Sequence, residues 1–138
     1  MHEIGILRLL DANYNRSKEG LRVIEDIFRF ILNNNALRKK IRSLRHCLDR
    51  QIQKEMLRDA IKARESERDL GKKIDYLELN RKNLNDILYA NFQRVKESLR
   101  VLEEFSKLIA PRYTSGIKKM RYNLYTLEKK TIKYWPAS

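Results

Sequence analysis

Residues 12–25 read ANYNRSKEGLRVIE and residues 90–103 read ANFQRVKESLRVLE, so one pattern occurs twice at an offset of 78 positions. In both copies the apolar residues fit one face of a helix with about 3.6 residues per turn. The polar residues also coincide, among them Asn13/Asn91, Arg16/Arg94, Lys18/Lys96, Glu19/Glu97, Arg22/Arg100 and Glu25/Glu103. Packing of a repeated helix requires only that the apolar residues match. The matching polar residues therefore indicate a site formed from two related helices.

The composition favours one helical domain that comprises residues 1–138. The chain contains only four Gly and two Pro, and 36% of its residues are charged. This length is sufficient for a core of its own, and the scarcity of helix breakers favours helices. A single cysteine, Cys47, excludes a disulfide framework and a thiolate metal site. Neither a signal peptide nor a run of about 20 apolar residues is present, so we expect a cytoplasmic protein without a membrane partner.

The net charge of +13 favours anionic partners, which include nucleic acids and phosphorylated small molecules. The positive excess is spread through the helical segments and is not collected in a tail. Basic residues alternate with Glu, and no nucleic-acid recognition motif is present. Nucleic acid is therefore the less favoured partner.

Four helical segments follow from the periodicity: from about residue 6 or 12 to 32, then about 36–63, 84–109 and 116–134. The first is expected to end at Asn33-Asn34-Asn35, because Asn tolerates the left-handed conformation, and the third at Pro111. Asp11 is either a helix cap or lies within a longer helix, and Ser115 is expected to cap the last helix. We predict an up-down-up-down four-helix bundle, all-α, in which the internal repeat relates the first and third helices. These helices would run parallel, with the loop 64–82 at the end where both copies begin.

In each copy of the repeat, the Asn and Arg fall within the apolar arc of the helix and Glu19 or Glu97 lies at its edge. Glu25 falls on the opposite side, whereas Phe30 and Ile31 lie within the arc. An inward-facing Arg is costly unless it is paired, and the i, i+3 spacing allows each Glu to orient its Arg. Two interpretations remain open, a structural ion-pair network and a ligand pocket at one end of the bundle.

Residues 64–82 contain mixed charges around Gly71, which is typical of a loop that closes on phosphate and equally of an ordinary solvated loop. Gly71-Lys72 lacks the other residues of a P-loop. His46 lies midway along the second helix, where it could bind phosphate only if it faced the pocket.

Four segments together resemble a small helical family of thiamin biosynthesis: DANYNRSKEGLRVIEDIFRF (11–30), LRH (44–46), AR…RDLG (63–71) and ANFQRVKESLRVLEEF (90–105). Members of this family are hydroxymethylpyrimidine phosphate kinases, found alone or fused in front of thiamin-phosphate synthase. The resemblance implies phosphorylation of 4-amino-2-methyl-5-hydroxymethylpyrimidine phosphate to the diphosphate, with ATP and Mg²⁺. The free pyrimidine is not expected to be a substrate. One departure from an exact repeat is Ser98, which stands where the first copy has Gly20.

Mapped onto this chain, the resemblance assigns a catalytic set of Arg16, Arg94, Glu19 and Glu97. It assigns substrate binding to Asn13, Asn91, Arg22, Arg100, Arg45, His46 and Arg64. It assigns the metal to Asp69 and Glu97. The alternative is a non-catalytic helical module that binds nucleic acid or a thiamin-phosphate synthase, and a homodimer is compatible with either function.

Overall fold

The computed structural model describes residues 2–52, 54–71 and 81–136, without the side chains of residues 54–56. Five α-helices make up most of this part of the chain: α1 (Glu3–Asp26), α2 (Asn35–Gln51), α3 (Lys54–Lys62), α4 (Leu84–Ile109) and α5 (Thr114–Thr131). A π-helical turn (Ile27–Ile31) and two 3-10 turns (Pro111–Tyr113 and Ile132–Tyr134) complete it. The described residues contain no strand, which confirms the all-α prediction.

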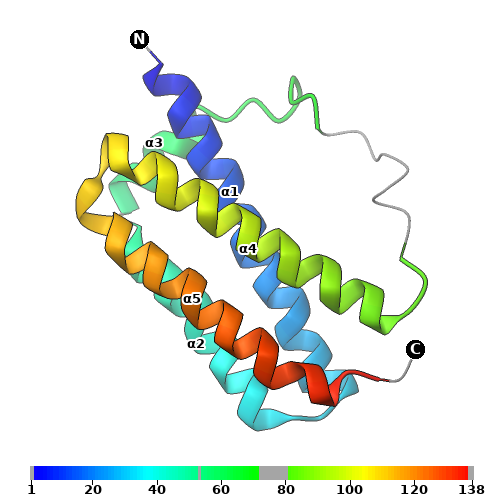
Figure 1. The fold of residues 1–138 in the computed structure, drawn as a ribbon. Coiled ribbons are helices and arrows are strands. Elements are labelled where there is room, and N and C mark those ends of the chain that lie inside the picture. Colours follow the sequence, from blue (N-terminus) through cyan, green and yellow to red (C-terminus); the bar gives the residue numbers. More distant parts are fainter. Residues whose placement is uncertain (1, 53, 72–80, 137–138) are drawn as a thin grey trace.

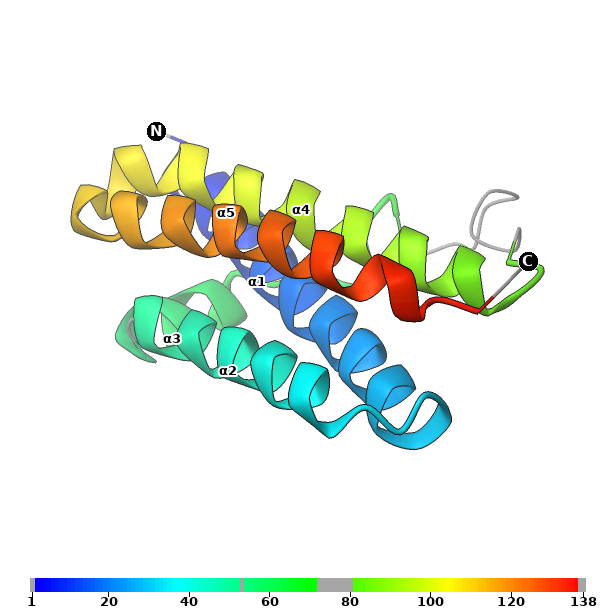
Figure 2. The ribbon, with the colours of Figure 1, turned by 60° about the horizontal axis from the view of Figure 1, so that its bottom comes forward.

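The helices form two hairpins that pack against each other (Figures 1 and 2). One hairpin is α1 with α2, and the other is α4 with α5. The most extensive contact joins α1 to α4, while α2 contacts α5 and α3 packs on α1. Fully buried apolar side chains from all four long helices meet between the hairpins, among them Leu21, Leu48, Leu99 and Leu124.

The crossing of α1 and α4 brings the two copies of the repeat together. The hydroxyls of Ser17 and Ser98 share a hydrogen bond 2.6 Å long. Gly20 faces Val95 so closely that an added Cβ would lie 2.6 Å from Cγ2 of the valine. Gly20 and Ser98 are equivalent in the repeat, as are Ser17 and Val95, so each contact corresponds to the other with the copies exchanged. The crossing therefore lies on a local two-fold axis.

The predicted helix directions are wrong. Position numbers rise along α1 while their contacts fall along α4, from Ser98 to Val95, so the two helices run antiparallel (Figure 1). The order is thus not up-down-up-down, and the two copies do not begin at the same end. The spacing of apolar residues does not reveal the direction in which a helix runs relative to its neighbours. The chain between the end of α3 at Lys62 and the start of α4 at Leu84 is also long enough to allow either direction.

The end of the first helix combines one confirmed prediction with one error. Asn33 has a left-handed φ of 51°, as expected for an Asn that ends a helix, and the side chain of Asn34 caps α2 by accepting from the N–H of Leu37. The π-helical turn before Asn33 adds a residue to one turn and rotates the following side chains. Phe30 and Ile31, predicted to be buried, are therefore 64% and 56% exposed.

Two local predictions also need correction, and one open alternative is decided. The helix predicted over 36–63 is interrupted at Ile52, whose backbone is extended, so that α2 and α3 are separate. Ser115 is not a cap, because α5 begins one residue earlier at Thr114 and its N-terminus has no side-chain cap. Of the two alternatives for Asp11 the second is confirmed, because Asp11 lies within the longer helix α1, where it is buried. No described helix combines the length and hydropathy that crossing a membrane requires.

Candidate functional site

The repeated lysines join the two helices of each hairpin. Nζ of Lys18 on α1 lies 2.8 Å from Oδ1 of Asp49 on α2, and Nζ of Lys96 on α4 lies 2.9 Å from Oε1 of Glu128 on α5. Asp49 also accepts a hydrogen bond from Tyr14. Burial raises the pKa of Asp49, but these hydrogen bonds outweigh burial and hold the pKa below its ordinary value of 3.8.

Glu25 and Glu103, which are equivalent in the repeat, also join the two helices of each hairpin. Glu25 accepts two hydrogen bonds of 3.1 and 3.0 Å from Arg45 of α2, and Glu103 accepts one of 2.8 Å from Arg121 of α5. Both glutamates are buried, contrary to the prediction that Glu25 faces away from the core. The prediction failed because α2 covers a second side of α1. For the repeated lysines and for Glu25 and Glu103, these contacts form the structural ion-pair network that was one of the two interpretations of the repeat.

Four residues predicted to bind substrate lie outside the two cavities that are described in the next paragraph. Arg22 pairs with Glu25 and Asp26 on its own helix, and Arg100 pairs likewise with Glu103 and Glu104. Arg45 is engaged by Glu25, and His46 is exposed on α2. None of the four lines the cavities described next.

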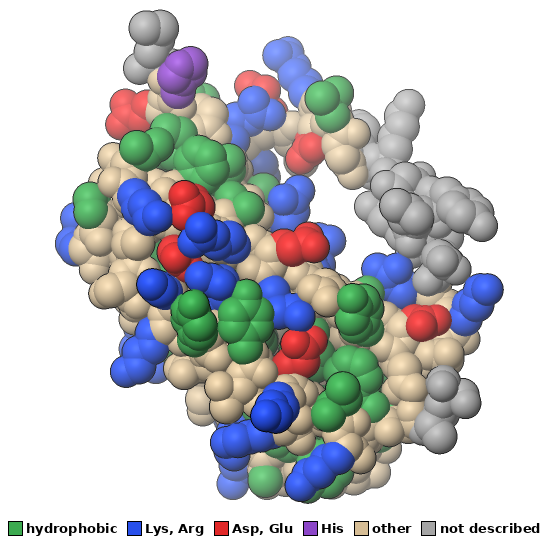
Figure 3. All heavy atoms as spheres, in the orientation of Figure 1, with side chains coloured by type: hydrophobic (Ala, Val, Ile, Leu, Met, Phe, Trp, Pro, Cys, Tyr) green, Lys and Arg blue, Asp and Glu red, His purple; other side chains and the backbone are tan. Residues whose placement is uncertain are grey.

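Two adjoining cavities lie along α1 and α4, and Figure 3 shows Lys and Arg side chains at the border of the hollow. The first, of about 750 Å³, is lined mainly by α4, including Tyr89, Gln93 and Glu97. The second, of about 900 Å³, lies between α1 and residues 64–71. Arg16 and Arg94 line both cavities. The two-fold crossing thus gathers the repeated arginines on one face although the helices are antiparallel.

Arg16 and Arg94 are exposed, and they differ from the other repeated cations because they form no ion pair with a described carboxylate. The prediction that they point inward is wrong. Arg16 donates only a 3.4 Å hydrogen bond to Oδ1 of Asn13, and within residues 2–52, 54–71 and 81–136 no carboxylate forms an ion pair with either arginine. The predicted i, i+3 pairs with Glu19 and Glu97 are therefore absent there. Both guanidinium groups remain available to an anion.

The repeated asparagines are held by their own helices. Nδ2 of Asn13 donates to the carbonyl of Leu9 at 2.9 Å, and Nδ2 of Asn91 donates to the carbonyl of Ile87 at 2.8 Å. Asn13 is buried as predicted and lines both cavities. Asn91 is partly buried and is not part of either lining. Only Asn13 is therefore placed to contact a ligand in these cavities.

A buried carboxylate anchors the loop beside the second cavity. Asp11 accepts hydrogen bonds of 2.7 and 2.6 Å from Arg64 and one of 3.1 Å from Nδ2 of Asn15. The hydrogen bond to Asp11 raises the pKa of the Arg64 guanidinium above its ordinary value. This role of Asp11 was not predicted, because its partner lies 53 residues away in the chain. The pair holds residues 64–71 against α1.

The predicted metal ligands lie in different cavities. Asp69 lines the second cavity, where its Oδ1 accepts from the N–H of Gly71 at 2.8 Å, and Glu97 lines the first. Among the described side chains, no group of three or more His, Cys, Asp or Glu could hold a metal ion. Mg²⁺ in phosphate-binding enzymes needs only one or two carboxylates beside phosphate and water ligands. Each cavity offers carboxylates of this kind, Glu97 in the first and Glu19 and Asp69 in the second.

Several lining residues were not identified from the sequence. Tyr89, Gln93 and Glu97 occur at intervals of four and share one stripe of α4. That spacing is the signal that could have identified Tyr89 and Gln93. Arg68 of the second cavity lies within the RDLG motif, directly before Asp69.

Comparison with known proteins identifies the family. Residues 8–130 match the model of the ThiD2 family. Thiamine-phosphate synthases of Nostoc punctiforme and Synechocystis sp. are 43% and 40% identical to this chain over 124 residues, which are 89% of this chain and 34% and 35% of those proteins. The chain therefore spans about a third of the length of these curated relatives. No solved structure gives a significant match. The family match and the names of the relatives support a role in thiamine biosynthesis, and the chain belongs to the ThiD2 family.

Proposed function

We propose that this protein is a kinase that phosphorylates 4-amino-2-methyl-5-hydroxymethylpyrimidine phosphate to the diphosphate, with ATP as phosphoryl donor. Membership of the ThiD2 family and the names of the relatives support the pathway. The observation that carries the reaction type is the pair Arg16 and Arg94, which line both cavities and form no ion pair with any described carboxylate. Phosphoryl transfer depends mainly on positioning and on neutralising the charge of the phosphates, which is a function of such arginines.

Two adjoining cavities suit a reaction between two phosphorylated substrates. In the proposal each cavity holds one substrate, and the phosphoryl group crosses at their common border beside Arg16 and Arg94. Asn13 orients Arg16 through its Oδ1 atom. Tyr89 offers an aromatic wall to a flat ring in the first cavity.

Carboxylates on both sides of the border are suited to bind the metal. Either Glu97 in the first cavity, or Glu19 and Asp69 in the second, would hold Mg²⁺ together with phosphate oxygens. The metal neutralises phosphate charge when it is bound. Arg64 contributes indirectly, because its bond to Asp11 keeps Asp69 beside the cavity.

A coupled kinase assay with ATP–Mg²⁺ tests the proposal, with the pyrimidine monophosphate and the free pyrimidine as alternative acceptors. We expect diphosphate formation from the monophosphate only. Arg16→Ala and Arg94→Ala should each lower kcat/KM by about 100-fold or more, since each removes a charge that stabilises the transition state. Circular dichroism should show unchanged helical content, because both side chains are exposed.

Arg42→Ala is the matched control. Arg42 is exposed on α2 and lines neither cavity, so the same loss of one positive charge should leave turnover unchanged. Turnover of neither pyrimidine by folded wild-type protein would refute the kinase proposal. An equal loss in Arg42→Ala would show that net charge, and not the position of Arg16 or Arg94, is responsible.

A second candidate is a non-catalytic role as a partner of a thiamine-phosphate synthase, which the names and greater length of the relatives favour. In that case the purified protein would bind the synthase and change its rate without turning over the pyrimidine phosphate. Analytical ultracentrifugation of the mixture, together with the synthase assay, distinguishes this function from the kinase.

A further inference from the structure

The positive charge is concentrated on one helix of each hairpin, α2 and α5, contrary to the expectation that it is spread through the helices. Helices α2 and α5 together contain eleven Lys and Arg against two acidic residues, a net charge of +9. Helices α1 and α4 together contain eight basic and nine acidic residues. The layer formed by α2 and α5 therefore carries most of the net charge of +13. A layer of this kind attracts anions.

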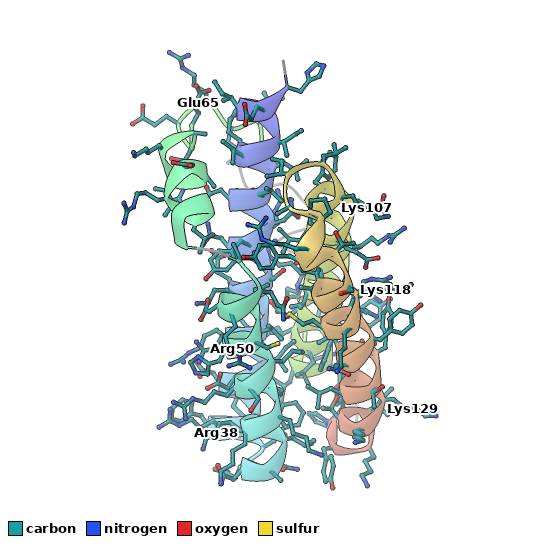
Figure 4. All side chains as sticks on the ribbon, turned by 90° about the vertical axis from the view of Figure 1, so that its left-hand side faces the viewer. Arg38, Arg50, Glu65, Lys107, Lys118 and Lys129 are labelled. Atoms are coloured by element: carbon teal, nitrogen blue, oxygen red, sulfur yellow. The ribbon has the colours of Figure 1, made fainter. Side chains whose placement is uncertain are left out.

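A groove of about 430 Å³ runs between α2 and α5 in this layer. Its apolar floor consists of Leu44, Cys47 and Leu127. Three lysines also line the groove, Lys39 and Lys40 from the start of α2 and Lys130 from the end of α5. Figure 4 looks onto this layer and shows Arg38 and Lys129 on either side of the same end, both pointing outward.

The groove lacks the neutralising groups found in the cavities of α1 and α4. No acidic residue is among its described lining residues, whereas each of the other two cavities contains carboxylates. Within the described part of the chain, Lys39, Lys40 and Lys130 form no ion pair. They differ in this from Lys18 and Lys96, whose charges are satisfied by Asp49 and Glu128. The groove is thus a site of unbalanced positive charge above an apolar surface.

We propose that this groove is a second ligand site, for a phosphorylated small molecule with an aromatic ring. The three lysines would bind the phosphate, and the ring would lie against Leu44, Cys47 and Leu127. The volume of the groove is that of a small-molecule site. Leu44 and Leu127 are more than nine-tenths buried, so the apolar surface that they offer to a ligand is small. A second copy of this chain is disfavoured as the occupant, since two such layers repel each other.

The single cysteine of the chain makes the proposal testable. Cys47 is partly buried in the groove, so a bound ligand should protect its thiol from N-ethylmaleimide. Adenosine monophosphate is the probe, and intact-mass spectrometry follows the rate of modification. At a concentration ten times its dissociation constant, the probe should slow the reaction about tenfold. Lys39→Ala/Lys130→Ala should abolish this protection.

Two control variants locate the effect. Lys118→Ala/Lys119→Ala removes the same charge from exposed positions of α5 outside the groove and should retain protection. Arg16→Ala/Arg94→Ala should retain it also, so that the result does not depend on the kinase proposal. Absence of protection by adenosine monophosphate would overturn the inference. Loss of protection in either control variant would do so as well. Protection by a single-stranded oligonucleotide alone, with a steep salt dependence, would instead identify a nucleic-acid surface.

Discussion

Gly20 should be the least replaceable small residue of the fold, because it sits where α1 crosses α4. A Cβ at this position would lie 2.6 Å from Cγ2 of Val95 and 3.3 Å from the backbone carbonyl oxygen of Asn91. Val95 is fully buried and β-branched, so its side chain cannot rotate away freely. The helices must therefore separate to accommodate even one methyl group.

Two opposing contributions determine the effect of Gly20→Ala on the free energy of unfolding. Alanine in place of glycine within a helix stabilises by about 1 kcal/mol. Overpacking of a well-filled core costs about 1–3 kcal/mol, and a contact of 2.6 Å with a rigid neighbour places this site at the upper end. We expect a net destabilisation of about 1–2 kcal/mol. Gly5→Ala, where nothing lies within 4 Å of the added atom, should instead stabilise by up to about 1 kcal/mol.

Urea unfolding followed by circular dichroism measures both variants. Val95→Ala provides the third corner of a double-mutant cycle, because it removes the Cγ2 atom that meets the new methyl group. Combined with Gly20→Ala, it should be less destabilising than the sum of the single changes by about 1 kcal/mol. A clash at the crossing is refuted if Gly20→Ala is as stabilising as Gly5→Ala. It is also refuted if the effects of Gly20→Ala and Val95→Ala on the free energy of unfolding are additive.

Three further predictions concern ion pairs. Glu103→Gln should lower the free energy of unfolding by about 2 kcal/mol, because it weakens a buried charged hydrogen bond. Glu104→Gln on the surface should have a much smaller effect, and equal effects of the two substitutions in urea unfolding would contradict this. Asp49→Asn should reduce the acid sensitivity of the fold. The lowered pKa of this carboxyl contributes stability that is present above 3.8 and is lost as pH falls through the lower folded value, so thermal unfolding from about pH 5 to pH 2 should show a smaller decrease than in wild type. Asp11→Asn should weaken the bond to Arg64 and accelerate tryptic cleavage within residues 64–71 at unchanged helical content, and an unchanged cleavage rate would show that the bond does not anchor the loop.

Local signals in the sequence were sufficient for some of the helices and helix ends. The span of α4 from Leu84 to Ile109 was predicted correctly, because apolar periodicity and Pro111 both act within one helix. Asn33 ended the first helix for an equally local reason, its tolerance of a positive φ. The π-helical turn before it was not predicted, and this single extra residue moved Phe30 and Ile31 to the surface.

The sequence also indicated a site at the repeat, but only the tertiary structure decided which repeated residues belong to it. Arg16 and Arg22 lie six positions apart on the same helix, and the sequence assigned both of them to the site. Arg22 pairs with Glu25 and Asp26 of its own helix, whereas Arg16 lies at the border of two cavities and forms no ion pair with a described carboxylate. The antiparallel crossing with α4 places Arg16 beside the same cavities as Arg94, whereas the acidic residues of α2 and α5 pair with Lys18 and Lys96. Both depend on contacts between residues distant in the chain, which the 3.6-residue period of a single helix does not encode.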